Sequence, residues 1–191
     1  SLLEQKKIAE ILSSVDDVIE NTQTQINKLS DLKTATMNEL LTKGIGHTEF
    51  RESELGLIPR TWEIKKIKEF CSVKGGKRLP KGKRFSEYPT PYPYLRVSDF
   101  RRNSIDMSQV KYVDIEIWQS ISRYTIGMRD IYISIAGTIG LIGMVPNSLD
   151  GALLTENAAK IGVASSGVKP GFLMWYLTSE VAQMQLKTEI G

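Results

Sequence analysis

The sequence has only one cysteine, Cys71, and one histidine, His47, in its 191 residues. A single cysteine excludes a disulfide within the chain and suits a reducing compartment, so we expect a cytoplasmic protein. One cysteine and one histidine cannot supply the ligands of a structural zinc site. A catalytic triad would have to use His47, which lies in a connecting segment. We therefore expect no metal and no cofactor.

Long apolar runs are also missing. No stretch approaches the roughly 18 residues that span a bilayer, and the first residues, SLLEQKKIAE, are charged too early for a secretory signal peptide. We expect no association with a membrane.

Residues 4–43 contain neither glycine nor proline. Their apolar residues recur every three or four positions, which predicts one helix about 60 Å long that ends at Gly44. The stripe approximates a heptad seam, and its central positions are the expected helix-pairing residues. These are Ile8, Ile11, Val15, Val18, Leu29 and Leu32. Because no comparable helix follows, we expect the covering helix to come from another chain or from a missing part of this one.

A connector is expected over residues 44–61, followed by a mixed domain over residues 62–191. Short strands are predicted by β-rich, alternating segments, and helices by apolar spacing and by the position of Pro170. The strands are 94–97, 109–113, 130–136, 139–145 and 158–163, and the helices are 114–122 and 170–189. The predicted fold class is α+β: a long coiled-coil-type helix, then a domain with short, mostly antiparallel strands.

Positive charge is concentrated in residues 60–102, which hold 13 lysines and arginines against 4 acidic residues, while the rest of the chain is slightly acidic. Such a block favours a nucleic-acid partner over a merely solvated surface. The candidate DNA-binding residues are Lys77, Arg78, Lys81, Lys83, Arg84, Tyr92, Tyr94, Arg96, Ser98, Asp99, Arg101 and Arg102.

These candidates divide by chemistry. The flexible point charges of Lys77, Lys81 and Lys83 suit phosphates, whereas the planar forks of arginine can discriminate guanine. Arg78, Arg96 and Arg101 are therefore the candidates for base edges. The tyrosines could donate to phosphate or pack on sugars, and Asp99 could accept from a base or orient a neighbouring arginine.

Motifs for catalysis are lacking. Five residues separate Gly76 from Gly82, and Arg84 follows Lys83, so neither the spacing nor the last residue of a phosphate-binding P-loop is met. Glu63 and Lys65 match only a short and frequent part of a nuclease motif, and TPYPY (90–94) lacks the acid or amide of an amino-methyltransferase box. We expect no catalytic residues.

Several segments together resemble the specificity (S) subunit of type I restriction-modification enzymes. They are LLEQKKIAEILSSVDDVIE (2–20), LLTKGIGHTEF (40–50), GLIPRTWEI (56–64), GGKRLPKG (75–82), PYPYLRVSDF (91–100), IAGTIGLIGMVP (135–146) and GALLTENAAKI (151–161). Together these segments span nearly the whole chain, and their order and spacing make the resemblance specific.

The resemblance implies a non-catalytic subunit that reads one half of a bipartite site in double-stranded DNA. It also implies docking to methyltransferase subunits, which carry the chemistry. The long helix would act as a spacer and pair either with another S-subunit segment or with the helix of a second copy, in a homodimer. A complete member of the family is roughly twice as long, so we expect a half-subunit or fragment. Two alternatives stay open: a coiled-coil scaffold protein with an incidental basic patch, and a nuclease or methyltransferase.

Overall fold

The computed structural model describes residues 1–164 and 167–188, in two compact units, Ser1–Thr61 and Trp62–Gly191. The predicted domain over 62–191 and the predicted helix over 170–189 thus include a few residues outside the described ones. The first unit contains helix α1 (Leu2–Lys43) and a small antiparallel pair of strands, β1 (Phe50–Arg51) and β2 (Ile58–Pro59).

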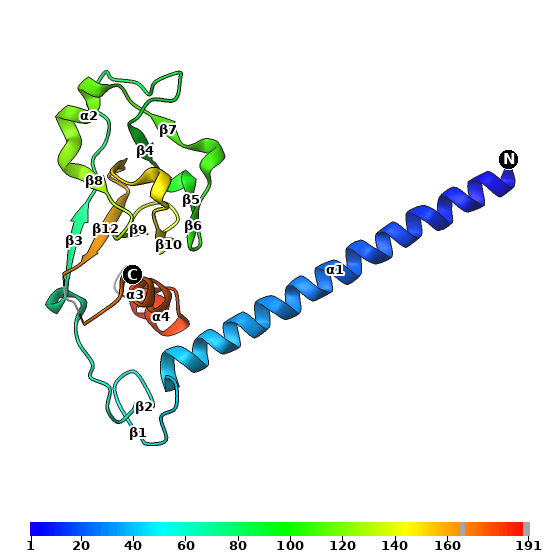
Figure 1. Cartoon of the computed structure of the whole chain (residues 1–191), viewed down its shortest axis with the longest axis horizontal. Helices are drawn as coiled ribbons and strands as arrows, with labels where there is room; N and C mark the ends of the chain where they lie inside the picture. The colour runs from blue at the N-terminus through cyan, green and yellow to red at the C-terminus, as the bar shows by residue number, and fades with distance from the viewer. Residues whose placement is uncertain (165–166, 189–191) are drawn as a thin grey trace. The chain divides into compact units, whose positions relative to one another are not determined.

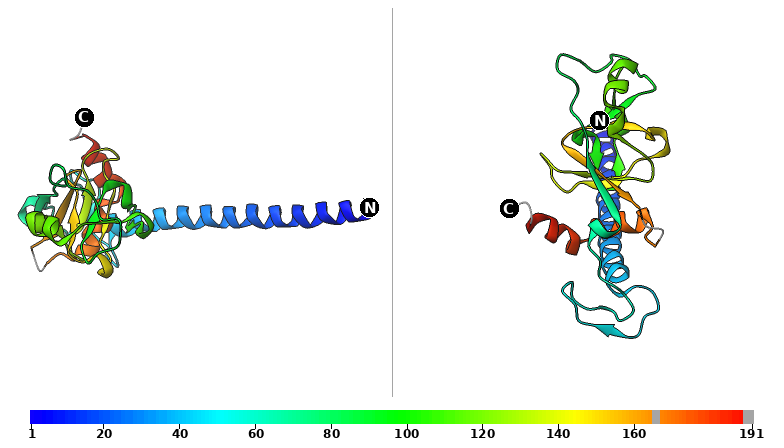
Figure 2. Two further views of the ribbon diagram at one scale, coloured as in Figure 1. Left: turned by 90° about the horizontal axis from the view of Figure 1, so that it is seen from above. Right: turned by 90° about the vertical axis from the view of Figure 1, so that its left-hand side faces the viewer.

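Helix α1 is one unbroken helix of 42 residues (Figures 1 and 2). A capping box opens it: the Ser1 hydroxyl accepts from the Glu4 backbone N–H, and the Glu4 carboxylate accepts from the Ser1 amino group. It ends where Gly44 adopts a positive φ of 67°. No residue of α1 is buried, and the six predicted helix-pairing residues are all more than half exposed.

The second unit contains two four-stranded sheets and three α-helices (Figure 1). The sheet that we call the first has the order β10-β9-β12-β3, with β3 Cys71–Gly75, β9 Ile131–Ser134, β10 Ile142–Met144 and β12 Ala158–Val163. The second has the order β7-β4-β11-β8, with β4 Pro93–Leu95, β7 Lys111–Tyr112, β8 Thr125–Ile126 and β11 Ala152–Leu154. A two-stranded pair, β5 Phe100–Arg101 and β6 Ser104–Ile105, is separate. The helices are α2 Ile115–Ile121, α3 Pro170–Leu177 and α4 Glu180–Thr188, with 3-10 turns at Ile67–Glu69, Val97–Asp99, Met107–Gln109, Ser122–Tyr124 and Asn147–Leu149.

Successive side chains of a strand point to opposite faces of its sheet, and the clusters that pack on these faces arrange the second unit in layers. Along β12, Ala159 and Ile161 face a cluster with Leu173 and Leu177 of α3, whereas Ala158 belongs to a cluster with Leu154 of the second sheet. On the other side of the second sheet, Leu153 packs with residues of α2. The order is therefore α3–α4, first sheet, second sheet and α2, and Figure 1 shows α2 and the α3–α4 pair on opposite sides of the two sheets.

The predicted fold class is confirmed: an α+β chain with a long helix and short strands that pair antiparallel, except for β4 with β11. One prediction over the C-terminal segment is wrong. The chain turns at Thr178 and Ser179 between α3 and α4, so the expected single helix is two helices. The side chains of Thr178 and Ser179 accordingly donate to the carbonyls of Trp175 and Tyr176, at the C-terminal end of α3.

Seven of the strands among the described residues were not predicted, and the longest of them are β3 and β11. β3 precedes Gly76 directly, although its residues are mostly exposed and lack alternation. It exists because it pairs over five residues with β12 at the sheet edge. β11 is buried on both faces between β4 and β8, which gives it no alternating pattern to detect.

Candidate nucleic-acid interface

The basic loop, Gly76–Pro91, leaves the first sheet after β3 and leads into β4 of the second sheet. It is held at its start, because the Gly76 and Lys77 backbone N–H groups donate to the carbonyls of Ala158 and Leu154 at 2.9 and 2.8 Å. At Gly76 the chain passes so close to β11 that a Cβ atom would lie 2.1 Å from the Thr155 carbonyl oxygen. Only glycine permits this approach.

The inner side of the basic loop is apolar. Leu79, Phe85 and Tyr92 pack against the cluster around α2, and the ring of Tyr92 lies 5.3 Å from that of Trp118. Buried Tyr94, on β4, donates its hydroxyl to the Lys77 carbonyl at 2.7 Å. Burial raises the pKa of Tyr94. The loop is thus fixed from beneath by residues that the sequence pattern alone suggested as ligand contacts.

The outer side of the basic loop carries five exposed cations: Lys77, Arg78, Lys81, Lys83 and Arg84. Two of them pair with acids. The Arg78 Nε donates to Glu156 at 2.5 Å, and Lys83 lies 3.4 Å from Glu116 on α2. Within the described part of the chain, Lys81 and Arg84 have no hydrogen-bond or ion-pair partner. This surface therefore offers free donors to an anion.

The Arg78–Glu156 pair fixes the base of the loop. Partial burial opposes ionisation of Glu156, but the hydrogen bond from Arg78 and bonds from the Glu156 backbone and the Thr155 hydroxyl outweigh it. The pKa of Glu156 consequently lies below its ordinary value. The same hydrogen bond raises the pKa of Arg78. The Arg78 side chain nevertheless remains 77% exposed, which leaves the other nitrogens of its fork open to solvent.

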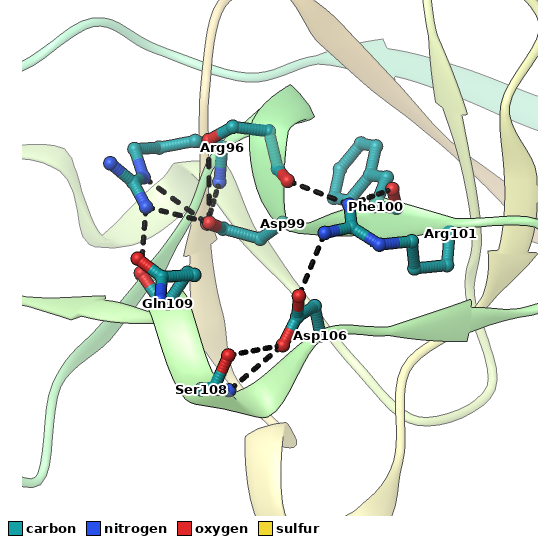
Figure 3. Close-up of polar contacts among 8 residues, drawn as sticks. Arg96, Asp99, Phe100, Arg101, Asp106, Ser108 and Gln109 are labelled. Carbon is teal, nitrogen blue, oxygen red and sulfur yellow. Dashed lines mark hydrogen bonds and ion pairs between the residues drawn. The ribbon is translucent and has the colours of Figure 1, made fainter. Parts of the chain in front are cut away.

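A second group of candidates forms the arginine cluster, Arg96, Asp99, Arg101 and Asp106, after β4 (Figure 3). The Asp99 side chain has no exposed surface. It accepts from the Arg96 backbone N–H at 2.8 Å and from Arg96 Nη2 at 2.7 Å, and the same Nη2 donates to the Gln109 carbonyl at 2.6 Å. In this arrangement Asp99 orients Arg96, and Arg96 holds the chain around it.

Arg101 is more exposed but also engaged. It donates to the Ser98 and Phe100 carbonyls, both at 2.9 Å, and to Asp106 at 2.7 Å (Figure 3). Asp106 also accepts from the hydroxyl and backbone N–H of Ser108, and these two bonds, more than Arg101, lower the pKa of Asp106.

The remaining candidates lie beside these two groups. The Ser98 hydroxyl donates to Asp99 at 3.3 Å, and Arg102 donates to the Thr178 carbonyl at 3.0 Å, at the end of α3. The structure thus gathers the loop cations on one segment and the arginines on the next, and it leaves Tyr94 and Asp99 buried.

Sequence reasoning missed three cations that surround a cavity beside the loop: Lys74, Arg123 and Lys160. They lie on β3, on the turn before β8 and on β12. Lys74 belongs to the basic block of residues 60–102, but up to 86 positions separate the three residues along the chain, so no local charge pattern could have grouped them. Within residues 1–164 and 167–188, no group of three or more acidic, histidine or cysteine side chains could hold a metal ion. No helix in the same ranges has the length and apolar character needed to cross a membrane.

The sequence family described as "Type I restriction modification DNA specificity domain" matches residues 59–189. The chain belongs to this family. The match includes the basic loop, the arginine cluster and both sheets of the second unit, so the resemblance based on short segments is confirmed.

Two curated relatives are specificity subunits from Methanocaldococcus jannaschii. The type I restriction enzyme MjaVIII specificity subunit is 29% identical, over 97% of this chain and 44% of the relative. The putative MjaX specificity subunit is 27% identical, over 93% of this chain and 40% of the relative. This specificity-domain chain therefore spans less than half the length of the curated relatives it matches.

A solved structure has the same fold. The HsdS subunit from Thermoanaerobacter tengcongensis matches with a TM-score of 0.53 and 14% sequence identity, over 95% of this chain and 42% of that one. The two curated relatives are described as specificity subunits, which argues against the scaffold and enzyme alternatives.

Proposed function

We propose that the Trp62–Thr188 part of the chain reads one half of a split target in double-stranded DNA, as a non-catalytic specificity module. The observation that carries this proposal is the exposed row of cations on the basic loop, inside the segment that matches the DNA specificity family. Phosphate contacts supply affinity and position, and a few forked side chains supply sequence preference. A DNA-reading role also fits the cytoplasmic location expected from the single cysteine.

The candidate residues take graded roles in this proposal. Lys77, Lys81 and Lys83 contact phosphates, because they project from a loop that is fixed from beneath. Arg78 is the leading base reader, because its fork is exposed while Glu156 holds its Nε. Arg96 and Asp99 act by positioning, since a fully buried carboxylate cannot reach a base in this conformation.

The remaining candidate residues either contact DNA or support the basic loop in this proposal. Arg101 and Arg102 stay candidates for DNA contact, and Arg84 and Ser98 are both exposed. Tyr92 and Tyr94 support the loop by packing.

The first unit has a separate role in the proposal. Residues 1–43 serve as a spacer and pairing helix, residues 44–61 as a connector, and methyltransferase subunits dock on the assembled protein. The exposed apolar stripe of α1 supports pairing with a second long helix, from another copy or from another S-subunit segment.

DNA binding by the full chain, together with its methyltransferase partner, tests the proposal. Selection from random duplexes should yield a preferred half-site. The triple variant Lys77→Ala, Lys81→Ala, Lys83→Ala should weaken binding to all sequences and reduce the slope of log K against log salt by about three, roughly one per lost phosphate contact.

The matched control is Lys66→Ala, Lys68→Ala, Lys187→Ala, which removes the same charge from exposed positions outside the loop. Its slope should stay near that of the parent. An equal loss in both triple variants would mean that net charge, and not the basic loop, sets the affinity.

Arg78→Ala should instead cost about ten- to a hundred-fold in affinity for the preferred half-site and relax the preference at one position. The chain alone, incubated with duplex DNA, magnesium and S-adenosylmethionine, should leave the DNA uncut and unmethylated.

A further inference from the structure

The three cations that the sequence did not reveal share one cavity of about 330 Å³ in the second unit. The cationic cavity is lined by Lys74, Gly75, Arg123, Tyr124, Thr125, Leu154 and Lys160. These residues come from β3 and β12 of the first sheet and from β8, β11 and the turn before β8. The cavity therefore lies between the β12–β3 side of the first sheet and the β11–β8 side of the second. Its volume is about ten times that of a water molecule in the liquid (~30 Å³), enough for a phosphate with an attached sugar.

The charge of the cavity is strongly one-sided. Three of its seven lining residues are cationic and none is acidic. The neighbouring Asp130 lies 3.3 Å from Lys160 and also accepts from the Gly127 backbone N–H. The Lys74 side chain is exposed, and its ammonium group has no hydrogen-bond or ion-pair partner among the described residues. One carboxylate against three cations leaves excess positive charge at the opening.

The two lysines are also placed against each other. Lys74 and Lys160 are direct cross-strand partners in the antiparallel pair of β3 and β12. Like charges directly opposite each other on one face of a sheet are destabilising. Asp130 already pairs with Lys160, so an anion beside Lys74 would neutralise the second ammonium group and remove the repulsion that is left.

Tyr124 joins the cationic cavity to the basic loop. The Arg123 guanidinium lies 5.0 Å from the centre of its ring, and the Lys77 ammonium lies 5.9 Å from it on the side of the loop. Lys77 also donates its backbone N–H to the carbonyl of Leu154, a wall of the cavity. One loop cation, Lys77, and one cavity cation, Arg123, thus meet at the same aromatic ring.

We infer that the cationic cavity is a binding site for a phosphate group, held by Lys74, Arg123 and Lys160, with the sugar against Tyr124. The DNA backbone is its source, which extends the proposed interface beyond the basic loop. The choice of DNA as the source rests on the proposed function, whereas the phosphate site itself does not.

Thermal unfolding of the full chain in inorganic phosphate, against chloride at equal ionic strength, tests the site without DNA. Phosphate should raise the Tm of the parent chain and shift the amide resonances of Gly75 and Thr125. Lys74→Glu should remove both responses. It should also unfold at the same or a higher Tm in chloride, because a carboxylate there would face Lys160.

The control is Lys187→Glu, on α4, which covers the other face of the first sheet. It should keep the full phosphate response. The inference is overturned if Lys74→Glu responds to phosphate as the parent does, or if the Gly75 and Thr125 resonances do not move.

DNA binding identifies the source of the phosphate. Lys74→Ala and Arg123→Ala should each reduce the slope of log K against log salt by about one, whereas Lys187→Ala should not change it. Unchanged slopes beside an intact phosphate response would overturn DNA as the source and leave a free phosphate ester as the ligand.

The two proposals fail separately. A phosphate response in a chain that binds no DNA would refute the DNA-reading function and support the site. DNA binding that depends on the basic loop, in a chain that does not respond to phosphate, would support the DNA-reading function and refute the phosphate site.

Discussion

Helix α1 and the Trp62–Thr188 unit use apolar residues in opposite ways. Twelve large apolar side chains of α1 are exposed and none of its residues is buried, whereas the second unit buries three clusters between its four layers. A helix without tertiary packing is marginally stable in water even with good caps. We therefore expect the second unit to fold by its own contacts, and α1 to gain most of its stability from the proposed partner helix.

The two regions can be followed separately by spectroscopy. All three tryptophans, Trp62, Trp118 and Trp175, lie in the second unit, and α1 has none. Tryptophan fluorescence therefore reports the packed unit, and far-ultraviolet circular dichroism reports mainly the 42-residue helix.

The largest effect should follow from charging the stripe of α1. Val15→Glu with Leu29→Glu would remove two apolar contacts from a pairing seam, at about 1.5–3 kcal/mol each. Sedimentation should show association weakened at least a hundred-fold, with the fluorescence transition unchanged. Ser13→Glu with Thr34→Glu adds the same charge on the opposite side of the helix and should leave association intact. Unaltered association of the stripe variant would mean that α1 is not the interface.

The packed unit should be most sensitive at Gly76. In Gly76→Ala, the new methyl group would meet the backbone oxygens of Leu154 and Thr155, which cannot move aside as a side chain can. Overpacking of this kind costs about 3 kcal/mol of unfolding free energy, measured by urea titration of fluorescence. Gly75→Ala is the control, since a Cβ there meets nothing within 4 Å. Equal stability of the two variants would contradict the close approach of β3 and β11.

A smaller loss is expected when Arg96 is replaced. Arg96→Ala leaves the fully buried Asp99 carboxylate with only its bonds to the Arg96 backbone N–H and Ser98, at a cost of about 2–3 kcal/mol of unfolding free energy. Arg101→Ala removes an exposed ion pair and two hydrogen bonds to backbone carbonyls, but it strands no buried charge, so it should lower the urea midpoint much less. Similar midpoints for the two variants would show that Arg96 is not a positioning residue.

The smallest effect concerns pH. The folded-state pKa of Asp106 lies below its ordinary value of 3.8, so its ionised form contributes stability above about pH 4. That contribution is lost as the pH falls through the lowered pKa. Asp106→Asn should therefore unfold at a lower urea concentration than the parent at neutral pH, and the gap should close in acid. If the difference in urea midpoint between the two proteins does not shrink as the pH falls, ionisation of Asp106 is not its cause.

The sequence alone determined the features that depend on neighbours along the chain. Residues 4–43 predicted α1 because helical periodicity and the lack of glycine and proline are local properties, and the positions of Gly44 and Pro170 marked real helix boundaries. The basic stretch was visible for the same reason, as a run of adjacent charges. The family resemblance followed from short segments in a fixed order.

Only the tertiary structure decided which of those residues face solvent and which distant residues meet. It buried Asp99 and Tyr94, because their polar atoms find partners on nearby backbone and on Arg96. Residues 71–75 have little apolar character and form β3 only because they pair with β12. The tertiary structure also brings Lys74, Arg123 and Lys160 to one cavity. Strand pairing between distant segments depends on the packing of the whole unit, which no local window of the sequence contains.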